Sequence, residues 1–340
     1  MNTPSRIGVG VIGTGRIGKL HIEHLSQNIP EADLLAICSL DIETAKSLAE
    51  QFNISAITTN YLTLISNSQI DAVIVASSTD THVEICQAAA AAGKHIFCEK
   101  PIALDLNQID ETIASIEDEA VKFQVGFNRR FDKNFMRVQE AIESGEIGEP
   151  HILRITSRDP APPPIEYVKV SGGMFLDMTI HDFDMARYLI GDEVDEIYAV
   201  GGVRVNPKIG EVGDIDTAII TLRFHNGVLS TIDNSRQAVY GYDQRVEAFG
   251  SKGMISVGNP LTNTVNFSGS EGSRAASPPY FFIERYKEAY LSEMEAFIRC
   301  ITEDTEPTVT GVDGRVPIVM GFAALKSLRE NRPVLLSEIS

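Results

Sequence analysis

The sequence predicts an α/β protein in two parts: a doubly wound parallel sheet, followed by an α+β domain with a large open, mostly antiparallel sheet. Three observations predict it. Strand and helix patterns alternate up to residue 126, a glycine-rich turn follows the first strand pattern, and strand patterns then follow one another with few helices between them. The chain has 340 residues, of which 43% are hydrophobic and 22% charged, enough for two buried cores. We expect domains at 1–126 and 127–340.

In the first part, single helices separate short apolar strands. Strands are expected at 6–12, 33–39, 72–76, 95–98 and 122–126, and helices after the glycine turn and at 42–51, 81–92 and 105–119. Such strands join through right-handed crossovers into a parallel sheet. The stretch 72–76 is almost wholly apolar, as expected for a strand covered on both faces.

In the second part, helices at 134–144 and 174–190 flank a strand at 151–158. Strands then follow one another from 196 to 267, and helices at 283–302 and 313–329 close the chain. The pair Asn226-Gly227 predicts a hairpin with a type I′ turn. This pattern indicates one broad sheet with helices on one face.

The charge balance narrows the choice of partner. There are 29 Lys and Arg against 47 Asp and Glu, a net charge of −18, which repels nucleic acid and anionic lipid. No apolar run approaches a membrane span, and the four cysteines are far apart. We therefore expect a cytoplasmic protein with reduced thiols that acts on a small molecule.

The glycine-rich turn has the spacing of a dinucleotide-binding motif. Gly13 allows the tight turn, Gly15 the close approach of a diphosphate, and Gly18 the packing of helix against strand. The diphosphate would lie at the helix N-terminus, where free N–H groups favour anions. The sequence thus predicts a Rossmann domain that binds NAD or NADP, with Thr14, Arg16 and Ile17 among its contacts.

The end of the second strand bears on the choice between the two cofactors. Ser39 stands where an acidic residue would hold the ribose and repel a 2′-phosphate, and Asp41 follows two residues later. Ser39 tolerates the phosphate, and Arg16 is the only cation nearby in the sequence. The choice stays open, with a slight preference for NAD because Asp41 could reach the ribose.

Polar residues also follow the third and fourth strands, at the edge where open α/β sheets bind ligands. The stretch from Ser77 to His82 either lines the cofactor or caps the next helix at Asp80 or Thr81; its expected cofactor contacts are Ser77, Ser78, Thr79 and His82. Glu99 and Lys100 precede Pro101, which restricts Lys100 to extended values and allows a cis bond that would aim the ammonium inward. Lys100 is expected to be functional rather than merely solvated. His21 and His24 are assigned to packing beside the glycine turn.

A third polar group lies in the helix expected at 174–190. Asp177, His181 and Asp184 are spaced i, i+4, i+7 and would share one face. An Asp beside a His fixes its tautomer and raises its basicity, as a general base requires. A buried salt-bridge network and a metal site are the alternatives.

Taken in order, these motifs resemble the glucose–fructose oxidoreductase/inositol dehydrogenase superfamily. The resemblance covers nearly the whole chain, through VIGTGRIGKLH, FCEKPIA, VGFNRRFD and GGMFLDMTIHDFDMARYL. The last two phrases and YGYD are most similar to the inositol 2-dehydrogenases. The resemblance implies oxidation of a ring hydroxyl of a neutral cyclic polyol to a ketone, and a dimer or tetramer formed through the second domain's sheet.

The resemblance also implies roles for individual residues. Lys100, Asp177 and His181 correspond to the family's catalytic lysine, aspartate and histidine. The remaining correspondences are Asn128 near the nicotinamide and Arg130, Asp184 and Tyr242 at the polyol. An aldose 1-dehydrogenase, a dinucleotide-binding regulator without turnover, and a metal-dependent isomerase or lyase remain as alternatives.

Overall fold

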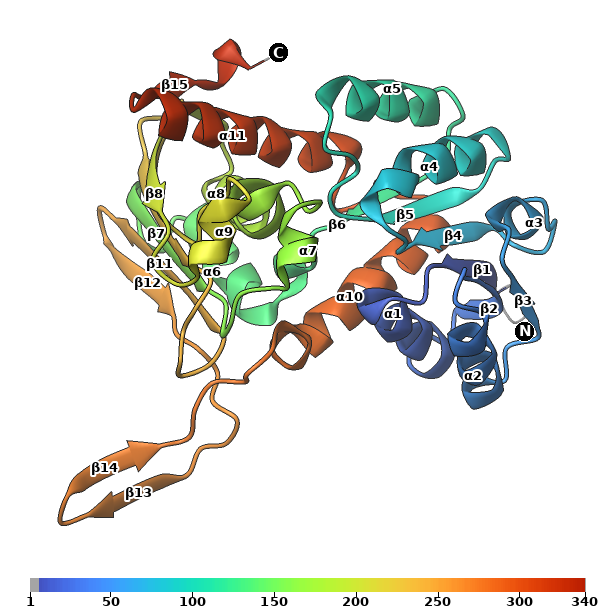
Figure 1. Cartoon of the computed structure of the whole chain (residues 1–340), viewed down its shortest axis with the longest axis horizontal. Helices are drawn as coiled ribbons and strands as arrows, with labels where there is room; N and C mark the ends of the chain where they lie inside the picture. Colours follow the sequence, from blue (N-terminus) through green and yellow to red (C-terminus); the bar gives the residue numbers. More distant parts are fainter. Residues whose placement is uncertain (1–5, 340) are drawn as a thin grey trace. The chain divides into compact units, whose positions relative to one another are not determined.

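The computed structural model describes residues 6–339, which fold into two compact units (Figure 1). The first unit consists of residues up to Asn128 together with Glu288–Val316, and the second of Arg129–Lys287 with the residues from Pro317 onward. The chain first passes from one unit to the other after Asn128, and it crosses again after Lys287 and after Val316. The segment Glu288–Val316 was expected in the second domain and folds with the first.

The first unit is a six-stranded parallel sheet with the order β3-β2-β1-β4-β5-β6. This is the doubly wound arrangement that the alternating pattern predicts, with a topological switch point between β1 and β4. The strands are β1 (Ile7–Ile12), β2 (Ala32–Cys38), β3 (Ala56–Thr58), β4 (Ala72–Val75), β5 (His95–Glu99) and β6 (Phe123–Gly126). The helices are α1 (Arg16–Gln27), α2 (Ile42–Phe52), α3 (Tyr61–Ile65), the short η1 (Thr79–Thr81), α4 (His82–Ala91) and α5 (Leu106–Glu117). The expected strands and helices are confirmed, whereas β3 and α3 were too short to give a periodic signal.

Helix α10 (Phe282–Thr302) supplies part of the first unit's core. Its later residues Met294, Phe297 and Ile298 are buried against Phe97 of β5 and the apolar side chains of β1 and β2. The ring of Phe297 meets that of Phe97 edge-on at 5.8 Å. The helix leaves regular geometry at Tyr286, close to where the chain passes from one unit to the other.

The second unit is built on a seven-stranded sheet with the order β12-β11-β7-β10-β9-β8-β15. Of its pairings only β7 with β10 is parallel, as expected for a mostly antiparallel sheet. The strands are β7 (Pro150–Arg158), β8 (Val194–Gly202), β9 (Thr217–Phe224), β10 (Leu229–Ser235), β11 (Asp243–Gly250), β12 (Gly253–Val257) and β15 (Val334–Leu335).

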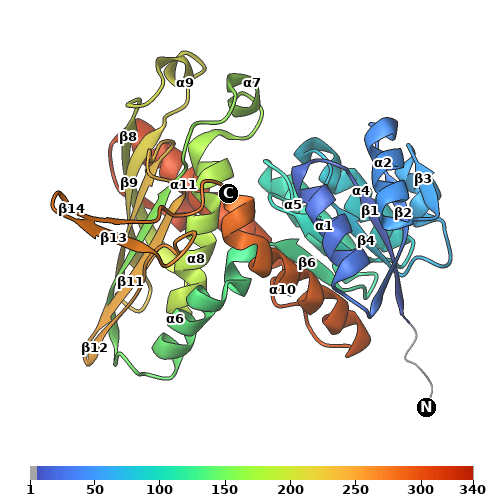
Figure 2. The same cartoon turned by 90° about the horizontal axis from the view of Figure 1, so that it is seen from below.

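Helices cover one face of this sheet, as predicted (Figure 2). The covering helices are α6 (Lys133–Glu143), α8 (Ile180–Ile190) and the later part of α11 (Gly311–Glu330), whose Ser327 accepts a hydrogen bond from the Ala199 N–H on β8. Shorter elements are η2 (Asn128–Phe131), α7 (Ile165–Val168), α9 (Pro207–Glu211) and η4 (Leu336–Glu338).

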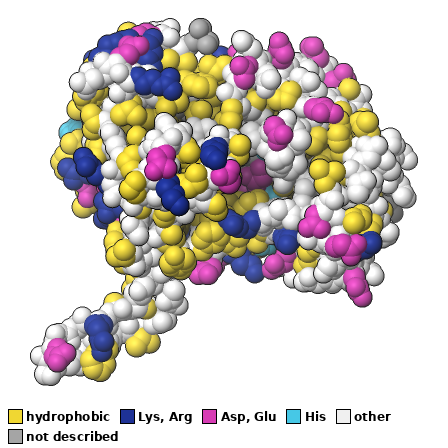
Figure 3. All heavy atoms as spheres, viewed as in Figure 1, with side chains coloured by type: hydrophobic (Ala, Val, Ile, Leu, Met, Phe, Trp, Pro, Cys, Tyr) yellow, Lys and Arg dark blue, Asp and Glu magenta, His cyan; other side chains and the backbone are white. Residues whose placement is uncertain are grey.

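Two local predictions in this unit are wrong. Strand β13 (Asn266–Gly269) does not join the broad sheet but pairs with β14 (Gly272–Ala275) in a separate hairpin that extends away from the rest of its unit (Figures 1 and 3). The turn after β9 is not type I′, because Asn226 keeps a negative φ and only Gly227 is left-handed. The Gly227 N–H bonds to the Phe224 carbonyl, and the result is a three-residue loop that ends in a glycine bulge.

Candidate functional site

The glycine turn between β1 and α1 has the geometry that the sequence predicts. Gly13 has a φ of +106°, and a Cβ there would lie 2.3 Å from the Ala76 carbonyl oxygen; a Cβ on Gly18 would lie 2.1 Å from the Gly13 oxygen. Gly15 faces open space and is the N-cap of α1 without a side chain that caps it. The first N–H groups of α1 are thus available to an anion, and the turn fits the diphosphate of a dinucleotide.

At the end of β2 the polar side chains are already paired with protein groups. Ser39 is buried, with its Oγ 2.6 Å from Thr14 Oγ1 and 3.1 Å from the Asp41 amide. The Asp41 carboxylate caps α2 by accepting from the N–H and hydroxyl of Thr44, and these bonds lower its pKa. Our expectation for Asp41 concerned only the ribose and overlooked this capping role.

The loop after β4 is held by its own hydroxyl groups. Ser77 Oγ lies 2.7 Å from Thr81 Oγ1, and the Thr81 hydroxyl reaches the Ser78 carbonyl at 2.7 Å. Thr81 is the N-cap residue of α4, but its side chain does not cap the helix. The side chain of His82 is buried and contacts backbone carbonyls instead of facing the loop surface. The predicted capping is absent here, and a cofactor contact by the His82 side chain remains only a prediction.

The end of β5 carries Glu99, Lys100 and Pro101. The Lys100–Pro101 bond is cis, the isomer that the sequence left open. The Glu99 carboxylate lies 2.8 Å from Nε2 of His21, a fully buried residue of α1. His21 is therefore buried, as a packing role requires, but its contact with Glu99 was not foreseen.

In the second unit, Asp177 lies on a single π-helical turn, Met174–Met178, that precedes α8. The wider turn shifts the phase of the helix, so the i, i+4, i+7 stripe of an ideal α-helix is not kept. Asp177 and His181 remain partly exposed, while Asp184 is 1% exposed. Asp177 therefore does not lie on the same regular α-helix as His181 and Asp184, which the predicted spacing assumed.

Both carboxylate oxygens of Asp177 are held by neighbours that the sequence did not indicate. Its Oδ1 accepts from the Tyr167 hydroxyl at 2.8 Å, and its Oδ2 from Arg236 Nη2 at 3.1 Å. Arg236 is 3% exposed, and its Nη1 reaches Asp159 Oδ2 at 3.3 Å. Burial raises the pKa of Asp159 to about 6, although Arg236 opposes the rise. No motif marks these partners, because they come from α7 and from the ends of β7 and β10, which are far apart in the sequence.

A buried polar network lies between α8 and the sheet. Arg129 Nη1 contacts Asp182 Oδ1 at 2.5 Å, and its Nη2 lies 3.3 Å from the Tyr242 hydroxyl. Asn234 completes the pairing of Asp182 at 2.8 Å and accepts from Thr179 at 2.6 Å. Burial raises the pKa of Tyr242, so its hydroxyl stays protonated. The network involves Asp182 of the helix that carries His181, and not Asp177, His181 or Asp184, for which the sequence left a buried network open.

Arg130 and Asp184 pair with each other. Arg130 Nε lies 3.0 Å from one carboxylate oxygen of Asp184 and Nη2 2.6 Å from the other. The guanidinium also lies over the Tyr188 ring at 5.4 Å. Both residues are buried, and a contact of either with a polyol remains a prediction.

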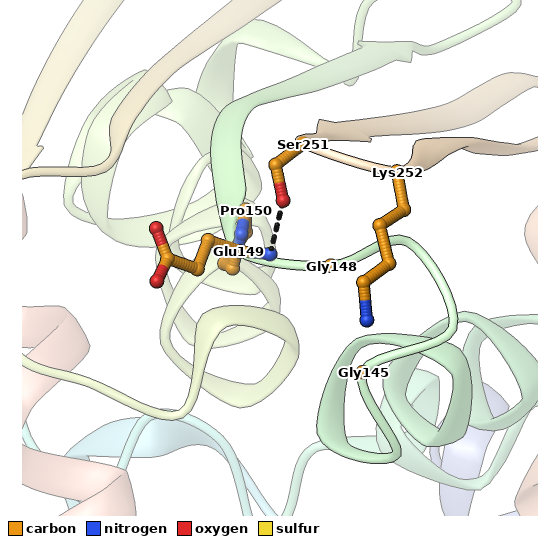
Figure 4. Close-up of a pocket in the computed structure, with 6 residues that line it drawn as sticks. All are labelled: Gly145, Gly148, Glu149, Pro150, Ser251 and Lys252. Atoms are coloured by element: carbon orange, nitrogen blue, oxygen red, sulfur yellow. Dashed lines mark hydrogen bonds between the residues drawn. The ribbon is translucent and has the colours of Figure 1, made fainter.

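Three further observations concern metal ligands, membrane-spanning helices and surface hollows. Within residues 6–339, no group of three His, Cys, Asp or Glu side chains is placed to hold a metal ion. No helix in that range is long and apolar enough to cross a membrane. A surface hollow at the α6–β7 and β11–β12 turns contains none of the predicted site residues; it is lined by Gly145, Gly148, Glu149, Pro150, Ser251 and Lys252 (Figure 4).

The predicted site residues therefore occur in both units. The glycine turn, Ser39, the loop after β4, Lys100 and Asn128 belong to the first, and Arg130, Asp177, His181, Asp184 and Tyr242 to the second. A doubly wound parallel sheet with this turn is typical of the dinucleotide-binding domain of oxidoreductases that use NAD or NADP.

Comparison with family models agrees with this class. Residues 7–127 match the oxidoreductase family with the NAD-binding Rossmann fold, and residues 135–256 match the GFO/IDH/MocA C-terminal domain. The chain belongs to the GFO/IDH/MocA oxidoreductase family, as the motifs indicated.

Relatives align over almost the full length. The chain is 50% identical to the myo-inositol 2-dehydrogenase of Thermotoga maritima, over 97% of this chain and 99% of that one. It is 40% identical to the inositol 2-dehydrogenase of Rhizobium meliloti, over 96% and 98%. The structure of the scyllo-inositol dehydrogenase of Lactobacillus casei with bound NAD(H) and scyllo-inositol superposes with a TM-score of 0.92 at 30% identity, covering 98% and 100%.

Proposed function

We propose that this protein oxidises a ring hydroxyl of a cyclic polyol of the inositol type to the ketone. The observation that carries the proposal is the 50% identity, over 97% of the chain, to a myo-inositol 2-dehydrogenase. The net charge of −18 also suits a neutral polyol better than a sugar phosphate or acid.

In this proposal His181 is the general base. Its Nδ1 is shielded from solvent, so we assign proton uptake from the substrate hydroxyl to Nε2. Asp177, which Tyr167 and Arg236 hold, provides the negative charge that favours the imidazolium. Lys100 donates a hydrogen bond to the same substrate oxygen and stabilises the charge that develops there. A bound nicotinamide supplies the hydride acceptor.

The first unit holds the cofactor in this proposal. The N–H groups at the start of α1 bind the diphosphate, with Thr14, Arg16 and Ile17 of the same turn. We prefer NAD, because the ionised Asp41 at the end of β2 repels a 2′-phosphate even while it caps α2. The remaining proposed contacts are Ser39, Ser77, Ser78, Thr79, His82, Glu99 and Asn128.

We further propose a homo-oligomer, a dimer or tetramer, formed through the uncovered face of the seven-stranded sheet. Large apolar side chains point outward along it: Val200, Ile219, Leu229, Phe249 and Met254 are 42–54% exposed. An uncovered apolar sheet face of this kind is typical of an interface. The four cysteines are buried and free, which suits a reducing cytoplasm.

Reduction of NAD or NADP, followed by absorbance and fluorescence, tests the function. We expect turnover with myo-inositol or scyllo-inositol and less with glucose or galactose. Preferred turnover of the aldoses would favour the aldose dehydrogenase. Cofactor binding without turnover of any of the four compounds would refute the proposal and favour the regulator.

A further inference from the structure

Lys100 lies between two residues that are each held by a buried histidine. Before it, the Glu99 Oε1 is 2.8 Å from Nε2 of His21; after it, the Pro101 carbonyl oxygen is 2.9 Å from Nδ1 of His82. His21 belongs to α1 and is 0% exposed, and His82 begins α4 and is 2% exposed. We propose that His21 and His82 are positioning residues that fix the Lys100 segment, Glu99 to Pro101, from both sides.

The contacts of His21 leave its ring one orientation. It packs edge-on against Phe97 at 5.2 Å and Tyr290 at 6.0 Å. Its Nδ1 is buried without a hydrogen-bond partner in the part of the chain that the structure describes, whereas Nε2 faces the Glu99 carboxylate, which can only accept, so the donated N–H belongs at Nε2. His21 therefore donates to Glu99.

The Glu99 carboxylate is confined on its other side by β6. A Cβ on Gly126 would lie 3.0 Å from Glu99 Oε2, so the carboxylate rests against a strand that has no side chain there. Between His21 and Gly126 the Glu99 side chain has a single place, and the end of β5 is fixed with it.

His82 holds the other side of the segment. Its second ring nitrogen, Nε2, lies 3.2 Å from the Ser77 carbonyl oxygen, a longer contact than the 2.9 Å to Pro101. Burial lowers the pKa of His82, so the ring is neutral and has one N–H to donate. The shorter contact assigns that N–H to Nδ1, and His82 donates to the Pro101 carbonyl.

The inference rests on the proposed function, in which Lys100 stabilises charge on the substrate oxygen. A lysine stem carries about 2 kcal/mol of rotamer entropy, so a useful ammonium needs a fixed backbone beneath it. Misplacement of such a group by about 1 Å can cost roughly a hundredfold in rate. Two independent donors, one from each flanking helix, provide that fixed backbone.

An exchange of amides at the two positions tests the inference. A glutamine amide nitrogen reaches the place of a histidine Nε2, and an asparagine amide nitrogen the place of Nδ1. His21→Gln and His82→Asn keep the required donor, whereas His21→Asn and His82→Gln are of the same polarity but misplace it. We expect the first pair to keep kcat within about threefold of the wild type and the second to lose about tenfold or more, with the Kd for NADH unchanged in the two His21 variants.

A second readout does not depend on turnover. Limited acetylation, mapped by mass spectrometry, should label Lys100 several-fold faster in His21→Asn and His82→Gln. Lys94, whose ammonium bonds to the Asn67 and Ile70 carbonyls of the same unit, serves as the internal standard. If the wild type oxidises no polyol while the two variants still show faster Lys100 labelling, the proposed function is refuted and the positioning role stands.

The matched control is His24→Asn, a change at a second buried histidine of α1 whose Nδ1 faces Asn28 at 3.4 Å. It should lower stability without changing kcat or Lys100 labelling. Equal behaviour of Gln and Asn at both positions, in kcat and in labelling, would overturn the inference. The same loss of kcat in His24→Asn would also overturn it. The two positions test it separately if one variant fails to fold.

Discussion

At the scale of single residues, no motif indicated the two hydrogen bonds that orient the Asp177 carboxylate. Its two oxygens accept from Tyr167 and Arg236, which lie 10 residues before it and 59 residues after it. Each donor fixes one oxygen, so the plane of the carboxylate is set. A base oriented by such a carboxylate depends on this arrangement.

Removal of the Tyr167 hydroxyl tests that dependence. Tyr167 is 48% exposed, so Tyr167→Phe should fold normally. We expect kcat for the polyol to fall about tenfold, because a hydrogen bond to a charged group is worth ~1.5 kcal/mol or more. Tyr198→Phe, which removes a comparable hydroxyl bond to Asn331, is the control and should leave kcat unchanged. Equal kcat values for both variants would contradict the role.

Asp41 has two roles: its side chain caps α2, and its negative charge is proposed to repel a 2′-phosphate. Substitutions can separate these roles. Asparagine caps helices as well as aspartate does, so Asp41→Asn removes the charge and keeps the cap of α2. We expect this variant to use NADP several-fold better relative to NAD, with a smaller loss of stability than Asp41→Ala, because one carboxyl oxygen still caps the helix. Asp41→Ala should show the same shift in cofactor use and a lower melting temperature. An unchanged cofactor ratio in both variants would show that Asp41 does not discriminate.

Asp159 predicts a pH dependence of stability. Its pKa of about 6 in the folded state lies above that of an exposed carboxyl, near 4, so between these values the folded state binds the extra proton. This group therefore lowers stability as the pH rises through that window. Asp159→Asn cannot ionise, so its melting temperature relative to the wild type should increase from pH 4 to pH 7. Melts followed by circular dichroism measure this, and a constant difference would contradict it.

At the scale of elements, the closing helices were predicted with good bounds but their place in the fold was not. Helix α10 was expected at 283–302 and spans Phe282–Thr302. Its apolar spacing indicates a buried face, and periodicity cannot tell which sheet buries it. The structure gives Met294, Phe297 and Ile298 to the core of the first unit.

Substitution of Phe297 tests how much α10 contributes to the stability of the first unit. It is 0% exposed, and Phe297→Ala should cost about 3–5 kcal/mol of the free energy of unfolding, because the cavity lies in a packed core. Since the chain has no tryptophan, urea unfolding is followed by circular dichroism. Phe267→Ala, at a ring that is 57% exposed on β13, should cost less than about 1 kcal/mol. Similar costs for both would show that α10 is not part of that core.

At the scale of the whole molecule, one face of the seven-stranded sheet exposes large apolar side chains that no other part of the described chain covers. Strand β9 alternates buried and exposed residues, and its outward positions include Ile219, which is 54% exposed. The prediction is that Ile219→Lys folds but forms smaller assemblies than the wild type in sedimentation velocity, since it would bury a charge in the interface. Val170→Lys, at an exposed site outside the sheet, should sediment as the wild type does. A monomeric wild type would end the proposal.

The sequence by itself determined the features that depend on local rules. The period of apolar residues indicated the parallel and antiparallel sheets, and the spacing of Gly13, Gly15 and Gly18 predicted a turn whose geometry only glycine allows. Lys100 stood out because it ends a strand at the edge where such sheets bind ligands, and Asp177 and His181 because an Asp one helical turn from a His suits a general base.

Only the tertiary structure decided what depends on contacts between distant segments. The π turn before α8 broke the expected stripe, the hairpin β13–β14 left the sheet, and residues 288–316 joined the first unit. The side chain of His21 contacts Glu99, and that of Arg236 contacts Asp177, across separations of 78 and 59 residues. Such pairs leave no period or spacing in the sequence, because the backbone that brings them together is ordered only when the whole core packs.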